Sequence, residues 1–98
     1  MAGWKLRLEE RAEGELRSAF LWYDERSPHA ADRFRLAVEA CINGIQDTPE
    51  SFPEVEPGIR RRLVRHGFPY GVLYRIVGDE VHVMAVMHLR RRPGYWRG

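Results

Sequence analysis

Arginines and aromatic residues gather near the C-terminal end of this chain, where their spacing suits the binding of an anionic partner. Arg90, Arg91 and Arg92 follow a long apolar run, and Tyr95 and Trp96 come after a Pro-Gly pair. Guanidinium groups make planar, bidentate contacts with phosphate or carboxylate groups, and aromatic rings offer stacking faces. The pattern favours a binding surface. The alternative is that Trp96 folds back over the core, as large aromatic side chains often do.

A second group of arginines lies in a strand-like run and comprises Arg60, Arg61, Arg62 and Arg65. Neighbouring residues of a strand point to opposite faces, so Arg60 and Arg62 should share one face and Arg61 and Arg65 the other. One set could simply pair with acidic side chains, and such surface ion pairs contribute little to stability. We expect the guanidinium groups of this run to form one continuous cationic face with those near the C-terminus.

The net charge of +2 conceals a strong asymmetry along the chain. Residues 1–57 hold 7 Lys/Arg and 12 Asp/Glu, whereas residues 58–98 hold 9 Arg and 2 Asp/Glu. A basic half of this kind suggests a polyanion or an acidic protein as the partner, although a solvated basic surface would have the same composition.

The histidines and the cysteine do not form a recognisable chemical site. His82 and His88 share strand parity but would lie roughly 20 Å apart, too far to bind one metal ion. His29 and His66 have no ligand partner at a suitable spacing, so we expect neither a metal nor another cofactor. Cys41 lies on an apolar helical stripe and should be a core residue. A single cysteine excludes an intramolecular disulfide and favours the reducing cytoplasm.

The apolar pattern predicts a strand at residues 4–8 and two helices after it. Helical spacing runs from Glu9 to about Arg26, and Ser27-Pro28 can end one helix and cap the next. The second helix should end near Asp47-Thr48, because Pro49 disfavours helical geometry at the residue before it. Its apolar stripe comprises Ala31, Phe34, Val38, Cys41, Ile42 and Ile45. Helices joined so tightly should lie antiparallel.

The second half of the chain reads as a surface loop at residues 50–58, followed by strands at 59–65, 70–77 and 81–88. Gly78-Asp79 is a plausible hairpin turn between the last two strands. The strand at 81–88 is apolar at nearly every position, which is typical of a central strand. The whole order predicts a single α+β domain over residues 1–98, with an antiparallel helical hairpin packed on a mostly antiparallel sheet that ends in a three-stranded meander. No apolar run is long enough to span a membrane.

Four stretches carry a family resemblance over essentially the whole chain: ERAEGELRSAFLWYDERSP, AADRFRLAVEACINGIQDTPESFP, GIRRRLVRHGFPYGVLYRI and VHVMAVMHLRRRPGYW. In this order they resemble the RelE/ParE superfamily of toxins from bacterial type II toxin–antitoxin systems. The resemblance implies a small basic protein that arrests growth when free and is neutralised by a cognate antitoxin in a hetero-oligomeric complex. RelE-like members cut messenger RNA on the ribosome, whereas ParE-like members inhibit DNA gyrase.

The residues that a RelE-like nuclease would use are only partly present. The resemblance implies basic residues on the meander and a tyrosine near the C-terminus, and it assigns these roles to Arg62, Arg90 and either Tyr95 or Trp96. The position of a further family arginine falls on Gly71, and an indole at position 96 cannot act as an acid or base near neutral pH. His88 resembles the histidine that ends this strand in ParE-like sequences. We therefore favour the ParE-like branch and gyrase as the target.

Two alternatives stay open, a ribosome-dependent endoribonuclease and a non-toxic binding module. In every case the resemblance implies an antitoxin partner, whose segment could fill an apolar groove near the two helices. The residues that we expect to bind the target or the antitoxin are Arg60, Arg62, Arg65, His88, Arg90, Arg91, Arg92 and Trp96.

Overall fold

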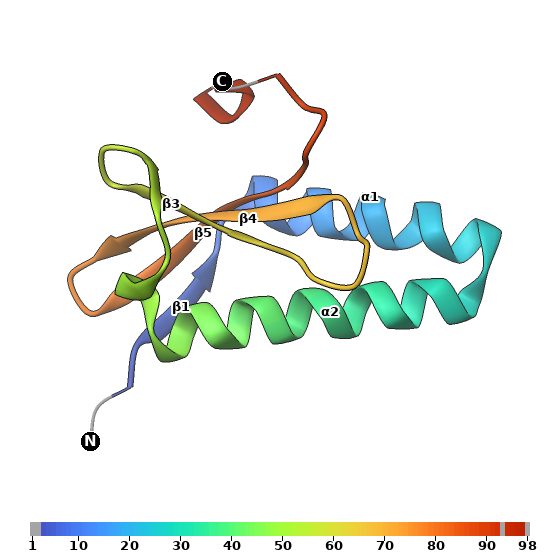
Figure 1. Ribbon diagram of the computed structural model, residues 1–98, viewed down its shortest axis with the longest axis horizontal. Helices are drawn as coiled ribbons and strands as arrows, with labels where there is room; N and C mark the ends of the chain where they lie inside the picture. Colours follow the sequence, from blue (N-terminus) through green and yellow to red (C-terminus); the bar gives the residue numbers. More distant parts are fainter. Residues whose placement is uncertain (1–2, 93, 98) are drawn as a thin grey trace.

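Two antiparallel helices pack against a five-stranded sheet in the computed structural model, which describes residues 3–92 and 94–97 (Figure 1). The helices and strands are β1 (Lys5–Leu8), α1 (Glu10–Arg26), α2 (Pro28–Asp47), β2 (Glu54–Glu56), β3 (Ile59–Leu63), β4 (Tyr70–Val77) and β5 (Glu80–His88). Two short 3-10 helices, η1 (Pro49–Ser51) and η2 (Tyr95–Arg97), complete the described elements. The predicted α+β fold is thus confirmed, and no helix among the described residues is long and apolar enough to cross a bilayer.

A one-residue junction turns α1 into α2. The backbone N–H of Ser27 donates to the carbonyl of Tyr23 and ends α1, while its hydroxyl accepts a hydrogen bond of 3.2 Å from the N–H of Ala30. Pro28 then occupies the first helical position, where its missing N–H does no harm. The predicted apolar stripe of α2 is confirmed, since every one of its residues is buried, Cys41 included.

The sheet has the strand order β1-β5-β4-β3-β2, so β5 is internal, as predicted. β1 runs parallel to β5, and every other pair is antiparallel. The loop predicted at residues 50–58 is wrong in part, because β2 pairs there with the start of β3. Gly58 makes this hairpin possible, since its φ of +80° belongs to the left-handed region that favours glycine.

A β-bulge in β5 decides which side chains face the helices. Val83 pairs with Tyr74 and Ala85 with Leu73, so Met84 has no partner and the alternation reverses after it. Val81, Val83 and Val86 therefore all pack on the helix side, together with Val72 and Tyr74. Leu73, Ala85 and Met87 form a smaller cluster on the opposite side, the outer face. The bulge also places His82 and His88 on opposite faces of the sheet. The prediction that these two histidines share one face of the strand is therefore wrong.

The end of the core nearest the helix junction is aromatic. The ring of Phe34 lies 5.0 Å from that of Tyr23, 5.4 Å from Phe68 and 5.2 Å from Tyr70. Such ring pairs contribute about 0.5–1.5 kcal/mol each beyond the burial of their area. Because these rings come from both helices and from the β3–β4 connection, they fix that connection against α1 and α2.

Candidate functional site

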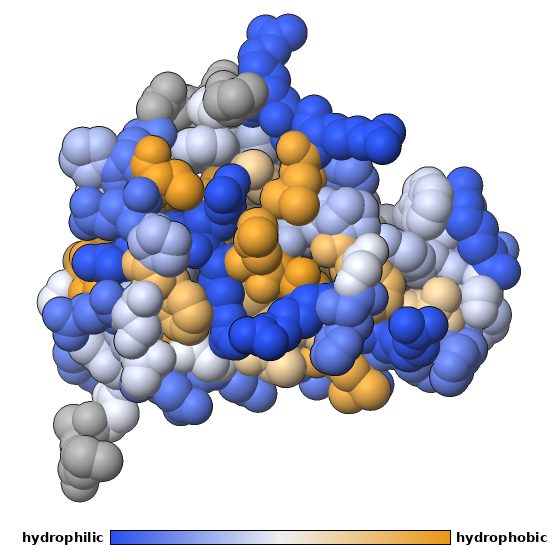
Figure 2. All heavy atoms as spheres, viewed as in Figure 1, coloured by the Kyte–Doolittle hydropathy of each residue, from blue (hydrophilic) through white to orange (hydrophobic). Residues whose placement is uncertain are grey.

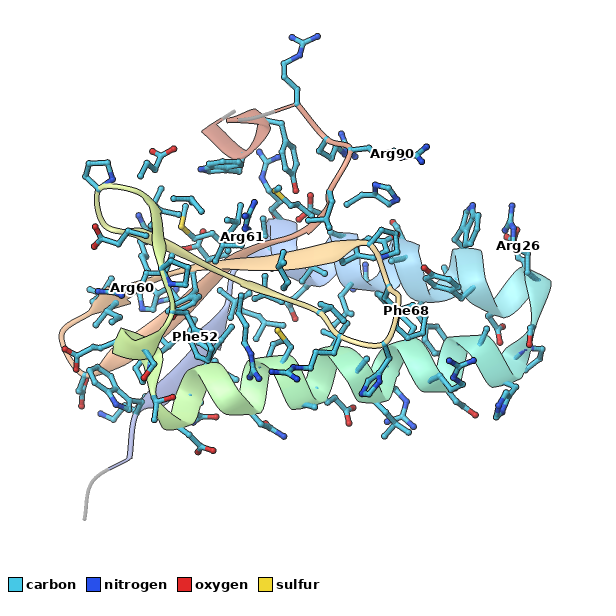
Figure 3. The ribbon with its side chains drawn as sticks, viewed as in Figure 1. Arg26, Phe52, Arg60, Arg61, Phe68 and Arg90 are labelled. Atoms are coloured by element: carbon cyan, nitrogen blue, oxygen red, sulfur yellow. The ribbon has the colours of Figure 1, made fainter. Side chains whose placement is uncertain are left out.

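Arg60 and Arg62 are the first two arginines that we expected to bind a partner. Both side chains point toward the helix side of the sheet. Nη1 of Arg60 donates to the carbonyl of Phe52 at 2.6 Å and to that of Glu50 at 3.1 Å, and Nη2 lies 3.8 Å from the carboxylate of Glu54. Figure 3 shows Arg60 reaching toward the turn that carries Phe52. Arg60 thus satisfies main-chain carbonyls of the segment between α2 and β2.

Arg62 makes similar contacts with α2. Its Nη1 donates to the carbonyl of Cys41 at 3.1 Å, and its guanidinium lies 4.8 Å from the centre of the Phe52 ring. Arg60 and Arg62 do share one face, as strand alternation predicts, but this face is the one that the helices cover. The expectation that they join Arg90, Arg91 and Arg92 in one continuous cationic face is therefore wrong.

Arg65 lies with Arg62 and not with Arg61, contrary to the prediction from alternation. The reason is that β3 ends at Leu63, so the two-residue period no longer applies at position 65. A tight turn follows, in which His66 and Gly67 both have positive φ, of +66° and +81°. The turn brings Arg65 back toward α2.

Arg62 and Arg65 line a groove of about 310 Å³ between α2 and β3, which we name the α2 groove. Its other main lining residues are Arg33, Leu36, Ala37, Ala40, Cys41, Leu63, His66 and Phe68. Leu36 and Leu63 are 56% and 49% exposed, so two large apolar side chains meet solvent between arginines. Figure 2 shows apolar side chains gathered in the middle of this face, between α2 and the sheet, with hydrophilic ones around them.

The backbone of β3 is open beside this groove. On the β2 side, Ile59 and Arg60 pair with β2 and the N–H of Arg61 donates to the carbonyl of Pro53. On the other side, the N–H of Val64 donates to the carbonyl of Tyr70 on β4. Because hydrogen-bonding direction alternates along a strand, the N–H of Leu63 points away from β4. The α2 groove therefore combines apolar side chains, cationic groups and a free strand edge.

The C-terminal segment covers the outer face of the sheet. Tyr95 and Trp96 pack against the cluster of Leu73, Ala85 and Met87, so the alternative in which Trp96 folds back over the sheet is confirmed. The Tyr95 hydroxyl donates a hydrogen bond to the Glu15 carboxylate, whose other oxygen accepts the N–H of Val86 at 2.9 Å. Burial and this bond to Glu15 raise the pKa of Tyr95 well above its usual range.

The arginines before this segment remain accessible. Arg90, Arg91 and Arg92 are all exposed, and Figure 3 shows Arg90 on the side of the sheet where the C-terminal segment lies. The guanidinium of Arg91 lies 4.9 Å from the centre of the Tyr95 ring, and that of Arg11 lies 5.6 Å from the same ring. His88 packs edge-on against the ring of Tyr70 at 5.1 Å.

His88 and Arg91 line a second groove, of about 730 Å³, between α1 and the ends of β4 and β5, which we name the α1 groove. Its lining from α1 includes Arg11, Glu15, Arg17, Ser18, Trp22 and Tyr23. None of these α1 residues was among the predicted site residues, which all lie on β3 or β5 or in the segments that follow these strands. The spacing of Arg11, Glu15, Ser18 and Trp22, by four, three and four residues, would have indicated a shared helix face.

The four residues assigned to RNA cleavage do not converge on one point. Arg62 lies on the helix side, whereas Tyr95 and Trp96 lie on the outer face. At Gly71 a β-carbon would lie 3.2 Å from Cδ of Arg61 and 3.5 Å from Cδ2 of Leu89, so neighbouring side chains already border the place of the missing family arginine.

Two further kinds of chemistry, a cysteine nucleophile and a metal site, find no support in this arrangement of the described residues. Burial raises the pKa of the Cys41 thiol to about 11, so the thiol is protonated near neutral pH and is not a nucleophile. Within residues 3–92 and 94–97, no three His, Cys, Asp or Glu side chains are grouped so that they could hold a metal ion.

Comparisons with known proteins identify the family to which this fold belongs. Residues 6–93 match the family model described as the ParE toxin of the type II toxin–antitoxin system parDE. Toxin ParE2 of Mycobacterium tuberculosis is 30% identical over 90 residues, which cover 91% of this chain and 85% of the relative. Toxin RelE1 of Caulobacter vibrioides is 30% identical over 79 residues, covering 80% and 85%. A solved structure titled a chromosomal ParDE toxin–antitoxin system from P. aeruginosa superimposes with a TM-score of 0.76 at 18% identity, covering 89% of this chain and 97% of that one.

Proposed function

This chain belongs to the family of ParE toxins of type II toxin–antitoxin systems, and we propose that the free protein arrests growth in the cytoplasm by inhibiting DNA gyrase. The observation that carries the choice of target is the dispersal of the nuclease residues over two sides of the sheet. Metal-independent RNA cleavage needs an acid, a base and a cation at one phosphate. Arg62 and Tyr95 are each committed to other partners, the Cys41 carbonyl and the Glu15 carboxylate.

The antitoxin, in this proposal, fills the α2 groove with an acidic amphipathic segment. The groove presents Leu36 and Leu63 to solvent and borders them with Arg33, Arg62 and Arg65. Apolar anchors of a bound helix would meet the leucines, and its acidic flanks would meet the guanidinium groups. The free edge of β3 beside Leu63 could add main-chain hydrogen bonds to an extended part of the same segment. The result is a hetero-oligomeric complex in which the toxin is covered.

Two assays on purified, antitoxin-free protein test the target. We expect the protein to inhibit supercoiling by gyrase or to trap cleaved DNA, and to leave ribosome-bound messenger intact. Adding the cognate antitoxin should restore gyrase activity. Messenger cleavage together with unaffected gyrase would refute the proposal.

Ribosome-dependent RNA cleavage is the second candidate, favoured by the similarity to a relative named RelE1 and by the exposure of Arg90 beside the C-terminal segment. In this case the Arg90→Ala variant would fold normally but lose messenger cleavage. A protein that is silent in both assays, and that leaves bacterial growth unchanged when expressed alone, would instead be a binding module without toxicity.

A further inference from the structure

The α1 groove presents one face of α1 to the ends of β4 and β5. Arg11, Glu15, Ser18 and Trp22 follow one another at spacings of four, three and four residues, which places them on the same side of the helix. All four line the groove, whose volume of about 730 Å³ lies in the range of small-molecule sites. A β-carbon at Gly14, also in the lining, would meet nothing within 4 Å, so this wall is open.

Cationic groups in the groove are not neutralised by the protein itself. Arg11, Arg17 and Arg91 line it, and within the described part of the chain none of them forms an ion pair. The one carboxylate of the lining, that of Glu15, is already engaged by Val86 and Tyr95. The guanidinium groups of Arg11 and Arg91 approach the same Tyr95 ring, at 5.6 and 4.9 Å. Two guanidinium groups near one ring, neither of them in an ion pair, are suited to a phosphate.

His88 adds a further donor to this set. Its Nδ1 accepts the N–H of Arg90 at 3.1 Å, so a neutral ring must carry its proton on Nε2. The hydroxyl of Ser18 can also donate. The polar part of the lining is therefore rich in donors, as the binding of an oxyanion requires.

The opposite part of the lining is aromatic. Trp22, Tyr23 and Tyr70 all line the groove, and Trp22 is 51% exposed. The guanidinium of Arg26 lies over the Trp22 ring at 3.7 Å from its centre, so a second flat group could stack only on the other face. An acidic peptide could satisfy the arginines, but its carboxylates would leave these rings unused. A nucleobase has a flat face that stacks on aromatic side chains whatever its sequence. Cationic donors next to aromatic rings therefore favour a nucleotide over a peptide.

We propose that the α1 groove binds a nucleotide, with the phosphate at Arg11, Arg17 and Arg91 and the base against Trp22 and its aromatic neighbours. The ligand is a free mononucleotide or one unit of a single strand, since both carry the same phosphate and base. This inference does not depend on gyrase being the target or on the occupant of the α2 groove.

Fluorescence anisotropy with fluorescein-labelled single-stranded octanucleotides, of DNA and of RNA, tests the proposal. We expect binding that weakens with salt. Arg11→Gln and Arg17→Gln should each weaken it by about tenfold and lower the salt dependence by about one unit of the log–log slope. Arg33→Gln is the matched control, because it removes one exposed arginine from the α2 groove and should leave strand binding unchanged within twofold. Circular dichroism melting should show that all three variants fold.

Competition identifies the form of the ligand. Displacement by AMP at a concentration comparable to that of the strands would identify a mononucleotide site, and displacement by unlabelled strands alone would identify a single-strand site. No binding at low salt, equal weakening by Arg33→Gln, or equally tight binding of an eight-residue polyglutamate peptide would each overturn the proposal. The gyrase assay is unaffected by any of these outcomes, so the two proposals fail separately.

Discussion

A β-carbon added at Gly44 would lie 1.8 Å from Nη1 of Arg62. The guanidinium of Arg62 therefore occupies the space that a side chain at position 44 would need, against the backbone of α2. This close approach lets Arg62 reach the carbonyl of Cys41 and the ring of Phe52. It also explains a glycine inside a 20-residue helix, where alanine would be the better helix former.

The first prediction concerns a double-mutant cycle at these two positions. In the wild type, Gly44→Ala should lower the free energy of unfolding by about 1 kcal/mol, because the lost contacts of Arg62 outweigh the gain in helix propensity. In an Arg62→Ala background the same substitution should raise it by about 1 kcal/mol. Urea unfolding of the four proteins measures both effects. If Gly44→Ala acts equally in the two backgrounds, the residues are not coupled.

The second prediction is a loss of stability in alkaline solution. Burial raises the pKa of Cys41 from 9.0 to about 11 and the pKa of Tyr74 from 10.0 to about 12. The unfolded chain releases these protons at lower pH than the folded protein, so their contribution is complete below pH 9 and is lost as the pH rises through the folded values. Each group should lower the free energy of unfolding by about 1.4 kcal/mol per pH unit within its own window. Urea unfolding at intervals from pH 8 to 11 measures the slope.

A cysteine-free variant separates Cys41 from the tyrosines, since burial raises the pKa of Tyr23, Tyr70 and Tyr95 as well as that of Tyr74. Cys41→Ala should have lower overall stability, because it leaves a space in the core, but its stability should not begin to fall until about one pH unit later. An unchanged onset near pH 9 in this variant would show that Cys41 is not the group responsible.

The third prediction concerns the attachment of the C-terminal segment. Glu15→Ala removes the acceptor for both the Val86 N–H and the Tyr95 hydroxyl, and should lower the free energy of unfolding by about 1–3 kcal/mol. It should also speed tryptic cleavage after Arg90 or Arg91, which mass spectrometry of samples digested under native conditions detects. Glu13→Ala is the control, since Glu13 is exposed on the same helix. Equal cleavage rates in the two variants would mean that Glu15 does not hold the segment.

The fourth prediction tests the α2 groove as the antitoxin site. Leu36→Asp should weaken binding of the cognate antitoxin by at least about tenfold, because it places a charge against an apolar anchor. Its effect on stability should stay within about 0.5 kcal/mol, since the side chain is half exposed. Leu21→Asp is the matched control, a leucine of α1 that is 50% exposed and lies outside the groove. Isothermal titration calorimetry should find wild-type affinity for the control; equal losses in both variants would argue against this site.

Local patterns in the sequence were sufficient for the helices and for most of the sheet. Ser27-Pro28 marks the junction by capping chemistry that needs no distant partner, and helical spacing identifies all the buried residues of α2 except Ala37. The hairpin of β2 and β3 was missed because its short strands carry charges and the signal of Gly58 resembles that of any loop.

The site could be predicted less well, because its contacts join residues that are far apart in the sequence. Strand alternation placed Arg60 and Arg62 on one face but could not show that helices cover this face. Nothing local pairs Glu15 with Tyr95, or brings Arg11 and Arg91 to one aromatic ring. The bulge at Met84 is likewise invisible in a run of apolar residues, and it alone decides which way His88 points.

The parallel pairing of β1 with β5 joins Lys5 to Glu80, close to opposite ends of the chain. During synthesis, β1 must wait until β5 has left the ribosome before it can enter the sheet. Such distant pairing slows folding relative to a helical protein of equal length. A product of premature termination that ends before Glu80 lacks the strand on which α1 packs, so its apolar helix faces stay uncovered and mark it for proteolysis rather than for activity.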